Sequence, residues 1–344
     1  MAGPVLRPGR KRQDNGGEAL NDGFPRPRLV ASKCLGFEAC RYDGGMISSD
    51  AVEQLREAAD FLPVCAEMEI GLGVPRRFVR VIGVGPKARL VQPATGLDVT
   101  DKMNSFAGSH LSSLRDIDGF ILKSRSPSCG IKDVKHYTAA EKGFAAETSA
   151  GLFGAAVLEA FPGTAVEDED RLRNMRIRDH FLTRIFTAAR FRRARDAKDI
   201  RALIDFHSDN KYLLMVHGPA AMQKLGRLVA NHDRMPLASV LEDYGRLLGV
   251  AMAKGPTFKA YVNFLQHAFG YVSKELGRPE RELFLDTLEL YREDRVPLES
   301  PMSLLRAWVA RFNVGYLKRQ TIFRPYPSDL SPGLDPAREK DYWK

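Results

Sequence analysis

The chain has 344 residues, of which 44% are hydrophobic and 28% are charged, a composition typical of a globular protein. A chain of this length is expected to form two domains, each able to bury its own core. No apolar run approaches the ~18 residues that a membrane-spanning helix requires, and residues 1–21 are polar and basic, unlike a secretory signal. We therefore expect a cytoplasmic protein that does not enter a membrane.

The net charge of +9 is unevenly distributed along the chain. Residues 171–344 carry 31 Lys and Arg against 20 Asp and Glu, whereas residues 1–170 carry 21 against 23. A nearly neutral half joined to a basic half is typical of a catalytic domain coupled to a domain that binds a polyanion.

The first half alternates short apolar runs with helical patterns. Residues 1–26 contain Gly-Arg-Lys-Arg and three prolines and predict a disordered basic tail. Strands are predicted at 28–34, 61–65, 78–84, 89–92 and 119–123, and helices at 48–59, 101–114 and 148–161. This alternation predicts an α/β domain over residues 27–170, with a mostly parallel sheet and flanking helices. The acidic run 165–170 is interpreted as its solvated boundary.

The second half has the pattern of long amphipathic helices, beginning with residues 174–194. Ile177, Phe181 and Ile185 lie on one stripe of that helix and are expected to face a core. Further helices are predicted at 202–206, 210–216, 220–230, 238–254, 256–277, 279–292 and 301–319. We therefore predict an all-α domain over residues 171–325, followed by an extended tail over residues 326–344.

Arginines populate the polar surface of the first long helix, where acidic partners four residues away are scarce. This face is either merely solvated or binds the phosphates of a nucleic acid. The candidate RNA-binding residues are Arg184, Arg190, Arg192, Arg193 and Lys211.

Three of the four cysteines follow predicted strands, namely Cys34, Cys65 and Cys129. If these strands are parallel neighbours, the three thiols converge on one edge of the sheet, where ligands bind in open α/β folds. Three thiolates suit an iron–sulfur cluster or a soft metal ion. The separations along the chain match no local metal-binding motif, so buried structural cysteines remain an alternative.

The sequence around these cysteines resembles a known family, the TudS-like thiouracil desulfidase domain. The resemblance is carried by Cys34-Leu35-Gly36 with Arg41-Tyr42-Asp43-Gly44, by Pro63-Val64-Cys65-Ala66-Glu67, and by Lys123-Ser124-Arg125-Ser126-Pro127-Ser128-Cys129-Gly130. The segment Phe206-His207-Ser208-Asp209-Asn210-Lys211-Tyr212, with His217, resembles the YbgA-like C-terminal domain. Together the two resemblances cover about residues 27–325.

The resemblance implies a 4Fe-4S cluster held by Cys34, Cys65 and Cys129, with the fourth iron free to bind the sulfur of a thiolated pyrimidine. Cys40 lies where the family has another residue, so it is interpreted as a non-ligand. The two-domain form implies a desulfidase that acts on 4-thiouridine in tRNA, with the helical domain holding the RNA.

Such a reaction is a net hydrolysis, and it requires a group that takes a proton from water. Glu67, two residues beyond Cys65, is the candidate for this role, although a carboxylate here also suits a loop or a helix cap. Ser126 is the candidate for hydrogen bonding to the base, although Ser-Pro pairs are common in turns. Ser124 and Asp43 are second choices.

The sequence is also compatible with three other functions. They are a desulfidase for free thiouracil-type bases, a three-cysteine zinc hydrolase whose metal activates water, and a non-enzymatic iron–sulfur regulator that binds nucleic acid.

Overall fold

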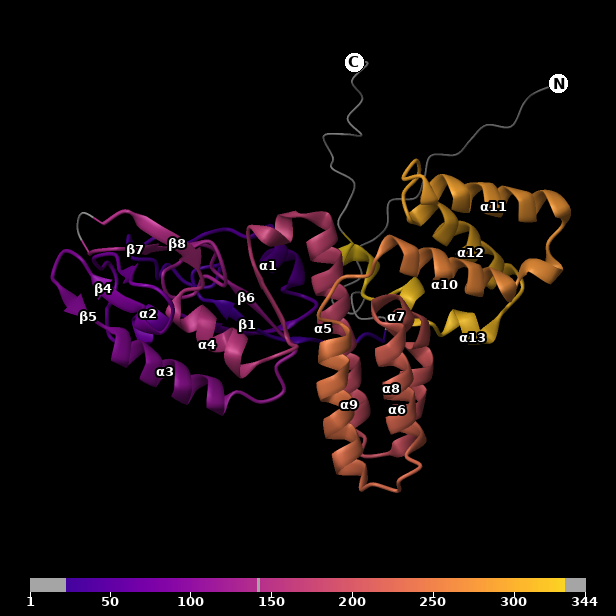
Figure 1. Cartoon of the computed structure of the whole chain (residues 1–344), viewed down its shortest axis with the longest axis horizontal. Coiled ribbons are helices and arrows are strands. Elements are labelled where there is room, and N and C mark those ends of the chain that lie inside the picture. The colour runs from indigo at the N-terminus through magenta and orange to yellow at the C-terminus, as the bar shows by residue number, and fades with distance from the viewer. Residues whose placement is uncertain (1–22, 141–142, 332–344) are drawn as a thin grey trace, which may run out of the picture.

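The computed structural model describes residues 23–140 and 143–331, and it divides into an α/β region and a helical region (Figure 1). This is the fold class that the sequence predicted. Residues 1–22 of the predicted basic tail and residues 332–344 of the predicted C-terminal tail lie outside the described residues. Within the described ranges, no helix is long and apolar enough to cross a bilayer.

The first sheet is wholly parallel, with strand order β2-β1-β6-β9. Its strands are β1 (Arg28–Ser32), β2 (Asp60–Val64), β6 (Gly119–Leu122) and β9 (Ala165–Asp168). The inner strand β6 is buried along its whole length. Its unbroken apolar sequence is typical of a parallel strand that is covered on both faces. The carboxyl ends of all four strands consequently meet at one edge.

The last strand of this sheet corrects the prediction of a solvated boundary at residues 165–170. Ala165–Asp168 instead pairs in parallel with β6. Asp168 is buried and accepts a hydrogen bond from the backbone N–H of Arg171 at 2.8 Å, while burial raises the pKa of its carboxyl. The acidic residues thus end a largely buried strand rather than form a solvated run.

A second sheet of mixed direction, with order β5-β4-β3-β7-β8, extends the α/β region. Its strands are β3 (Arg80–Ile82), β4 (Arg89–Gln92), β5 (Leu97–Asp98), β7 (Val134–Tyr137) and β8 (Ala145–Ser149). Only β3 and β7 pair in parallel; the other neighbours are antiparallel. The sequence analysis missed β7 and β8, and the helix predicted from residue 148 begins only at Leu152.

Four helices flank these sheets: α1 (Asp50–Leu55), α2 (Ala66–Glu69), α3 (Thr100–Ser113) and α4 (Leu152–Ala160). In Figure 1, α3 and α4 lie side by side along one face. Their buried residues Met103 and Phe153 belong to the same core as Phe120 of β6. This core fixes the position of the loops that follow the parallel strands.

The helical region has its own core, in which Tyr244, Phe264 and Phe284 are fully buried. Its α-helices are α5 (Met175–Asp196), α6 (Ile200–Asp209), α7 (Lys211–His217), α8 (Pro219–Ala230), α9 (Leu237–Ala251), α10 (Phe258–Gly270), α11 (Arg278–Arg292), α12 (Glu299–Arg311) and α13 (Gly315–Lys318).

Helix α5 connects the two regions because its apolar side packs into the α/β core. Ile185 of this helix shares a hydrophobic cluster with Ile121 of β6. Phe24 packs edge-on against Phe186, with ring centroids 5.9 Å apart, and Tyr326 is buried in the same cluster. The described parts of both predicted tails are therefore packed, because their aromatic residues cover this cluster.

Candidate active site

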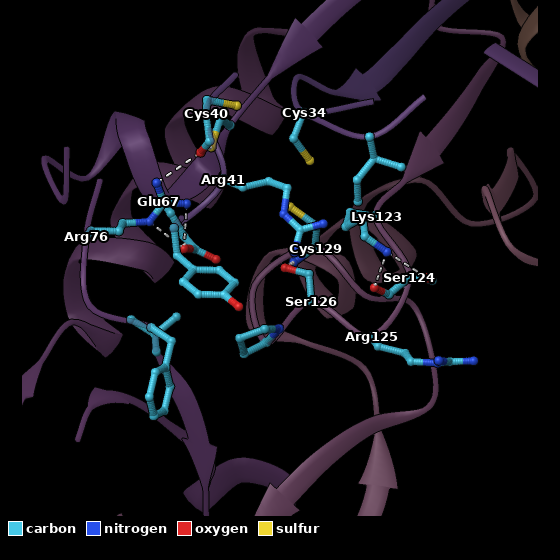
Figure 2. A pocket seen from close by; sticks show the side chains of 16 residues that line it. Cys34, Cys40, Arg41, Glu67, Arg76, Lys123, Ser124, Arg125, Ser126 and Cys129 are labelled. Atoms are coloured by element: carbon cyan, nitrogen blue, oxygen red, sulfur yellow. Dashed lines mark hydrogen bonds and ion pairs between the residues drawn. The ribbon is translucent and has the colours of Figure 1, made fainter. Parts of the chain in front are cut away.

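The three predicted cysteines do converge at the carboxyl edge of the parallel sheet. Cys34 lies two residues beyond β1, Cys65 directly follows β2, and Cys129 lies in the loop that follows β6. All three line one cavity of about 350 Å³, which we call the cysteine cavity, and Cys40 lines it as well. Figure 2 shows the thiols of Cys34, Cys40 and Cys129 around the cavity, with Arg41 extending into it. The parallel arrangement of β1, β2 and β6 is what brings the residues together.

The four thiols are buried and free of disulfide bonds. Burial raises the pKa of Cys34 to about 11 and that of Cys40 to about 12, and the neighbouring thiol of Cys65 contributes to both shifts. Burial also raises the pKa of Cys129. Without a bound cation, the thiols of Cys34, Cys40 and Cys129 are therefore neutral near pH 7.

Cys40 packs against Cys34 and Cys65, although the sequence analysis interpreted it as a non-ligand. The Cys65 Sγ lies 3.8 Å from the carbonyl oxygen of Cys40. Cys40 is fully buried, whereas the other three cysteines each keep a small exposed fraction. The structure therefore places a fourth thiol within reach of the predicted ligand set.

Glu67 lines the cysteine cavity, and hydrogen bonds hold both oxygens of its carboxylate. Its Oε1 accepts a hydrogen bond from Ser128 Oγ at 2.9 Å, and its Oε2 accepts one from Arg76 Nε at 2.8 Å. Arg76 also donates to the carbonyl oxygens of Cys40 and Gly73, each at 3.0 Å. The Glu67 carboxylate is thus tied to the cysteine loops by a nearly buried ion pair, and its position is set before any ligand arrives.

A second polar network lines the cavity where β6 and β9 end. Glu169 is buried and accepts hydrogen bonds from the backbone N–H and the hydroxyl of Ser124 at 2.7 and 2.8 Å. Lys123 forms an ion pair with Glu169 and donates to the hydroxyl of Ser124 at 2.8 Å. The hydroxyl of Ser124 therefore already has its hydrogen-bond partners within this network. The ammonium group of Lys123 brings a positive charge to the cavity wall.

The remaining two candidates differ in position. Ser126 lines the cavity, and its Oγ accepts the backbone N–H groups of Ser128 and Cys129 at 3.3 and 3.1 Å, so it shapes the turn that presents Cys129. Its hydroxyl proton stays available to a ligand. Asp43 does not line the cavity; it is exposed and accepts the backbone N–H of Gly45 at 3.0 Å. That hydrogen bond, with Arg41 nearby, lowers the pKa of Asp43.

Most of the arginines proposed to bind RNA are turned toward the protein. Arg184 donates to the Gly163 carbonyl at 2.8 Å, and Arg192 forms a buried ion pair with Asp118 at 2.9 Å. Arg190 lies over the ring of Phe24 at 4.9 Å, and burial lowers its pKa to about 10. Helix α5 thus uses these cations to attach the helical region to the sheet.

The other two of the five RNA candidates face solvent. Arg193 is exposed, with one guanidinium nitrogen 3.2 Å from the Gly23 carbonyl. Lys211 is also exposed and borders an open depression that contains Tyr271 and Tyr316. The rings of these two tyrosines stack at 5.6 Å. These two cations remain accessible to a polyanion.

Sequence reasoning missed Arg76, Lys123 and Glu169 as components of the site. Lys123 stands within the motif that contains Cys129, so its position next to the strand end was a usable signal. Glu169 lies one residue beyond β9, but the local sequence there resembles a solvated acidic run. Arg76 reaches Glu67 from nine residues away, and no periodicity in the sequence indicates that contact.

The arrangement defines an α/β protein with a cysteine-lined cavity at the carboxyl edge of a parallel sheet. Residues 29–169 match the family model described as 2-thiouracil desulfurase, and residues 211–327 match a model described as a protein of unknown function, DUF1722. The chain belongs to the 2-thiouracil desulfurase family over its α/β region and carries a DUF1722 region after it. The family is one of desulfurases, and both predicted resemblances are confirmed.

Individual relatives are each similar to less than half of the chain. The chain is 32% identical to YbbK of Bacillus subtilis over 110 residues, which are 30% of this chain and 72% of that protein. It is 27% identical to YbgA of Escherichia coli over 154 residues, 44% of this chain and 91% of that protein. A solved structure described as the [4Fe-4S]-dependent thiouracil desulfidase TudS is 28% identical, covers 43% of this chain and 94% of its own, and has a TM-score of 0.35.

Proposed function

We propose that this protein is a desulfidase that removes the sulfur of 4-thiouridine in tRNA, using a 4Fe-4S cluster held by Cys34, Cys65 and Cys129. The observation that carries the proposal is the convergence of these strand-end cysteines on one cavity that also contains a fixed carboxylate, Glu67. Membership of the desulfurase family supports the same chemistry.

The residues of the cavity supply the donor atoms that an iron–sulfur cluster requires. A lone zinc ion takes all of its ligands into one tetrahedral shell. Within residues 23–140 and 143–331, no three His, Cys, Asp or Glu side chains are grouped so as to hold one ion. A cluster spreads its cysteine ligands over several irons, and the soft thiolates around this cavity are the donors that it requires.

The reaction proposed here is a net hydrolysis in which water supplies the oxygen that replaces sulfur at C4, and sulfide leaves. Carbon, sulfur and oxygen keep their oxidation states, so the balance needs no electron donor. When bound, the cluster supplies a soft Lewis acid for the thiocarbonyl sulfur.

In this proposal Glu67 is the proton acceptor. Its carboxylate is held by Arg76 on one oxygen and by Ser128 on the other, and each of these oxygens keeps a lone pair that can accept a proton from water. The fixed orientation avoids the cost of ordering the side chain during the reaction. Ser126, whose hydroxyl proton is available, is placed to donate to the carbonyl oxygen of the base.

The charge balance of the cavity favours the anion that the reaction produces. Arg41, Arg76 and Lys123 line it together with Glu67. Arg76 and Lys123 are paired with carboxylates, and Arg41 lies 3.4 Å from Asp43. Positive groups along a low-dielectric wall stabilise developing negative charge on sulfur and on the pyrimidine ring.

The tRNA part of the proposal rests on the basic helical region and on its exposed cations. Residues 171–344 carry an excess of 11 positive charges. Arg193 and Lys211 are exposed, and Lys211 borders the stacked pair Tyr271 and Tyr316, so this surface combines a cation with aromatic rings as single-stranded RNA sites do. The 4-position of a stacked base is shielded, so local unstacking must precede the reaction.

A cysteine series with an internal control tests the cofactor assignment. Protein purified without oxygen and reconstituted with iron and sulfide is analysed for iron, sulfide and visible absorption. We expect Cys34→Ala, Cys65→Ala and Cys129→Ala to lose the cluster and Cys40→Ala to keep it. Loss in Cys40→Ala together with retention in Cys34→Ala would instead assign Cys40 as the ligand. Colourless protein that binds zinc alone would contradict the proposal.

A further inference from the structure

Cys40 is the one cysteine of the chain to which the proposed function assigns no role. It is fully buried, whereas Cys34, Cys65 and Cys129 are 9%, 9% and 7% exposed and line the cysteine cavity. Cys40 packs in a small buried cluster with Cys34 and Cys65, and Met68 lies against this cluster. A small molecule that enters the cavity therefore reaches the other three thiols before it reaches Cys40.

Cys65 is the neighbour that Cys40 contacts most closely. A side-chain hydrogen bond links the two thiols, and the Cys65 Sγ lies 3.8 Å from the carbonyl oxygen of Cys40. In the described part of the chain, Cys34 acts on Cys40 through its charge and not through a hydrogen bond. A covalent bond to Cys65 therefore needs less movement of the Cys40 side chain than a bond to Cys34.

Arg76 holds the segments of the two cysteines together. Its Nη1 donates to the Cys40 carbonyl at 3.0 Å, and its Nε donates to Oε2 of Glu67, two residues beyond Cys65, at 2.8 Å. The Arg76 side chain is 5% exposed, and Figure 2 shows both interactions on its one guanidinium group. The Cys40 N–H also donates to the Glu38 carbonyl at 2.9 Å. Contacts within the protein thus fix the backbone of Cys40 beside Cys65.

We propose that Cys40 and Cys65 form an oxidation site, in which the two thiols join as a disulfide when the cluster is absent and a peroxide enters the cavity. Hydrogen peroxide transfers one oxygen to the Cys65 sulfur, which becomes a sulfenic acid, and one water leaves. The Cys40 sulfur then attacks the Cys65 sulfur. The S–S bond forms, the S–O bond breaks, and the oxygen leaves as a second water with the proton of the Cys40 thiol. One peroxide is thereby reduced to water, and two thiols are oxidised to one disulfide.

The disulfide makes the loss of the cluster reversible. A Cys65 sulfur that is bound to Cys40 does not ligate iron, so the oxidised chain takes up a cluster only after a thiol reductant has cleaved the bond. The same bond keeps Cys65 from oxidation to sulfinic and sulfonic acids, which thiol reductants do not reverse. This consequence rests on the proposed function, in which Cys65 is a cluster ligand, whereas the disulfide itself does not depend on that function.

Peptide mapping of the full-length chain tests the disulfide. The protein is freed of metal with a chelator, reduced without oxygen and treated with an equimolar amount of hydrogen peroxide. Free thiols are blocked with N-ethylmaleimide, and the chain is cleaved after lysine, arginine and glutamate. Glu38 lies between Cys34 and Cys40, so this cleavage places the two cysteines on different peptides. We expect a linked pair of peptides that contain Cys40 and Cys65, while Cys34 and Cys129 are blocked as free thiols. Dithiothreitol is expected to cleave the link.

Cys34→Ala is the matched control, because it removes another thiol of the same buried cluster and leaves the proposed pair intact. We expect Cys34→Ala to form the link as wild type does. Cys40→Ala is expected to form no link to Cys65 and to accumulate sulfinic acid there. A link between Cys34 and Cys65 in wild type, or equal sulfinic acid at Cys65 in wild type and Cys40→Ala, would overturn the inference.

Reconstitution with iron and sulfide separates this inference from the proposed function. After peroxide and then dithiothreitol, we expect wild type to regain the iron content of untreated protein and Cys40→Ala to regain less. Equal recovery in the two proteins would contradict the protection of Cys65. If untreated wild type binds no cluster, the proposed function fails, and the peptide mapping still decides whether Cys40 and Cys65 form the disulfide.

Discussion

Glu67→Gln tests the assigned proton acceptor with the smallest change in shape. Glutamine keeps the size of the side chain and one carbonyl oxygen that accepts from Arg76, and Arg76 keeps its bonds to the carbonyls of Cys40 and Gly73. The charge of a nearly buried ion pair is lost, with side chains 5% and 11% exposed. Because every partner keeps a hydrogen bond, we expect a loss of about 1–3 kcal/mol in unfolding free energy, below the ~3–5 kcal/mol of an unpaired buried charge.

The effect on the reaction is expected to be larger than the effect on folding. An amide does not accept a proton from water at neutral pH, and a positioned general base contributes about 10²–10⁴-fold in rate. Turnover of 4-thiouridine is therefore expected to fall by at least ~100-fold, which is roughly 3 kcal/mol in the activation barrier. The iron and sulfide content of the reconstituted protein is expected to equal that of wild type.

Glu69→Gln is the matched control for this substitution, since Glu69 is exposed on the same short helix α2. We expect its turnover and its cluster content to match those of wild type. Turnover of Glu67→Gln within about tenfold of wild type, at equal iron content, would refute the assignment of Glu67 and shift the proton transfer to another group of the cavity.

Two further predictions concern the helical region. Arg192→Glu leaves the Asp118 carboxylate, 4% exposed, beside a second negative charge. We therefore expect the free energy of unfolding, measured in urea, to fall by about 3–5 kcal/mol, against less than about 0.5 kcal/mol for the exposed Arg193→Glu. Equal losses in the two variants would contradict the buried pair. Burial lowers the pKa of His217 to about 4, with His180 and Arg184 adding to the shift. The folded protein thus binds this proton less readily than the unfolded chain, and the stability contribution is complete above about pH 6.5 and is lost as the pH falls toward 4. His217→Gln is expected to reduce the pH-dependent part of the unfolding free energy by up to roughly 3 kcal/mol. The control variant His232→Gln, at an exposed position, is expected to keep the wild-type pH dependence. Identical pH dependence in the two variants would refute the buried neutral ring.

The cysteine site was predictable because it depends on local patterns. Cys34, Cys65 and Cys129 each follow an apolar strand, and the parallel direction of β1, β2 and β6 suffices to bring them to one edge. Glu67 was also accessible to sequence reasoning, because it is close to Cys65 in the chain. What the sequence did not show is that Arg76 and Ser128 hold this carboxylate, since these contacts form only in the folded chain.

The remaining errors come from interactions between distant residues. In the sequence, the arginines of α5 resemble a solvated face, because the acidic partner of Arg192 is Asp118, which lies 74 residues away. Strand β8 is exposed along its whole length and lacks the apolar alternation that predicts a strand, so only its pairing with β7 defines it. The acidic run after residue 165 was taken for a solvated boundary because its charges are neutralised by partners such as Lys123 on another loop.

The central claim is that the cysteine cavity removes sulfur from thiolated uridine. The most direct measurement incubates anaerobically reconstituted protein with tRNA containing 4-thiouridine and follows the near-ultraviolet band of the thiolated base together with released sulfide, beside a Cys65→Ala control. We predict loss of the band with one sulfide released per base converted, and neither change in the control. Persistence of the band with a fully loaded cluster would contradict the account.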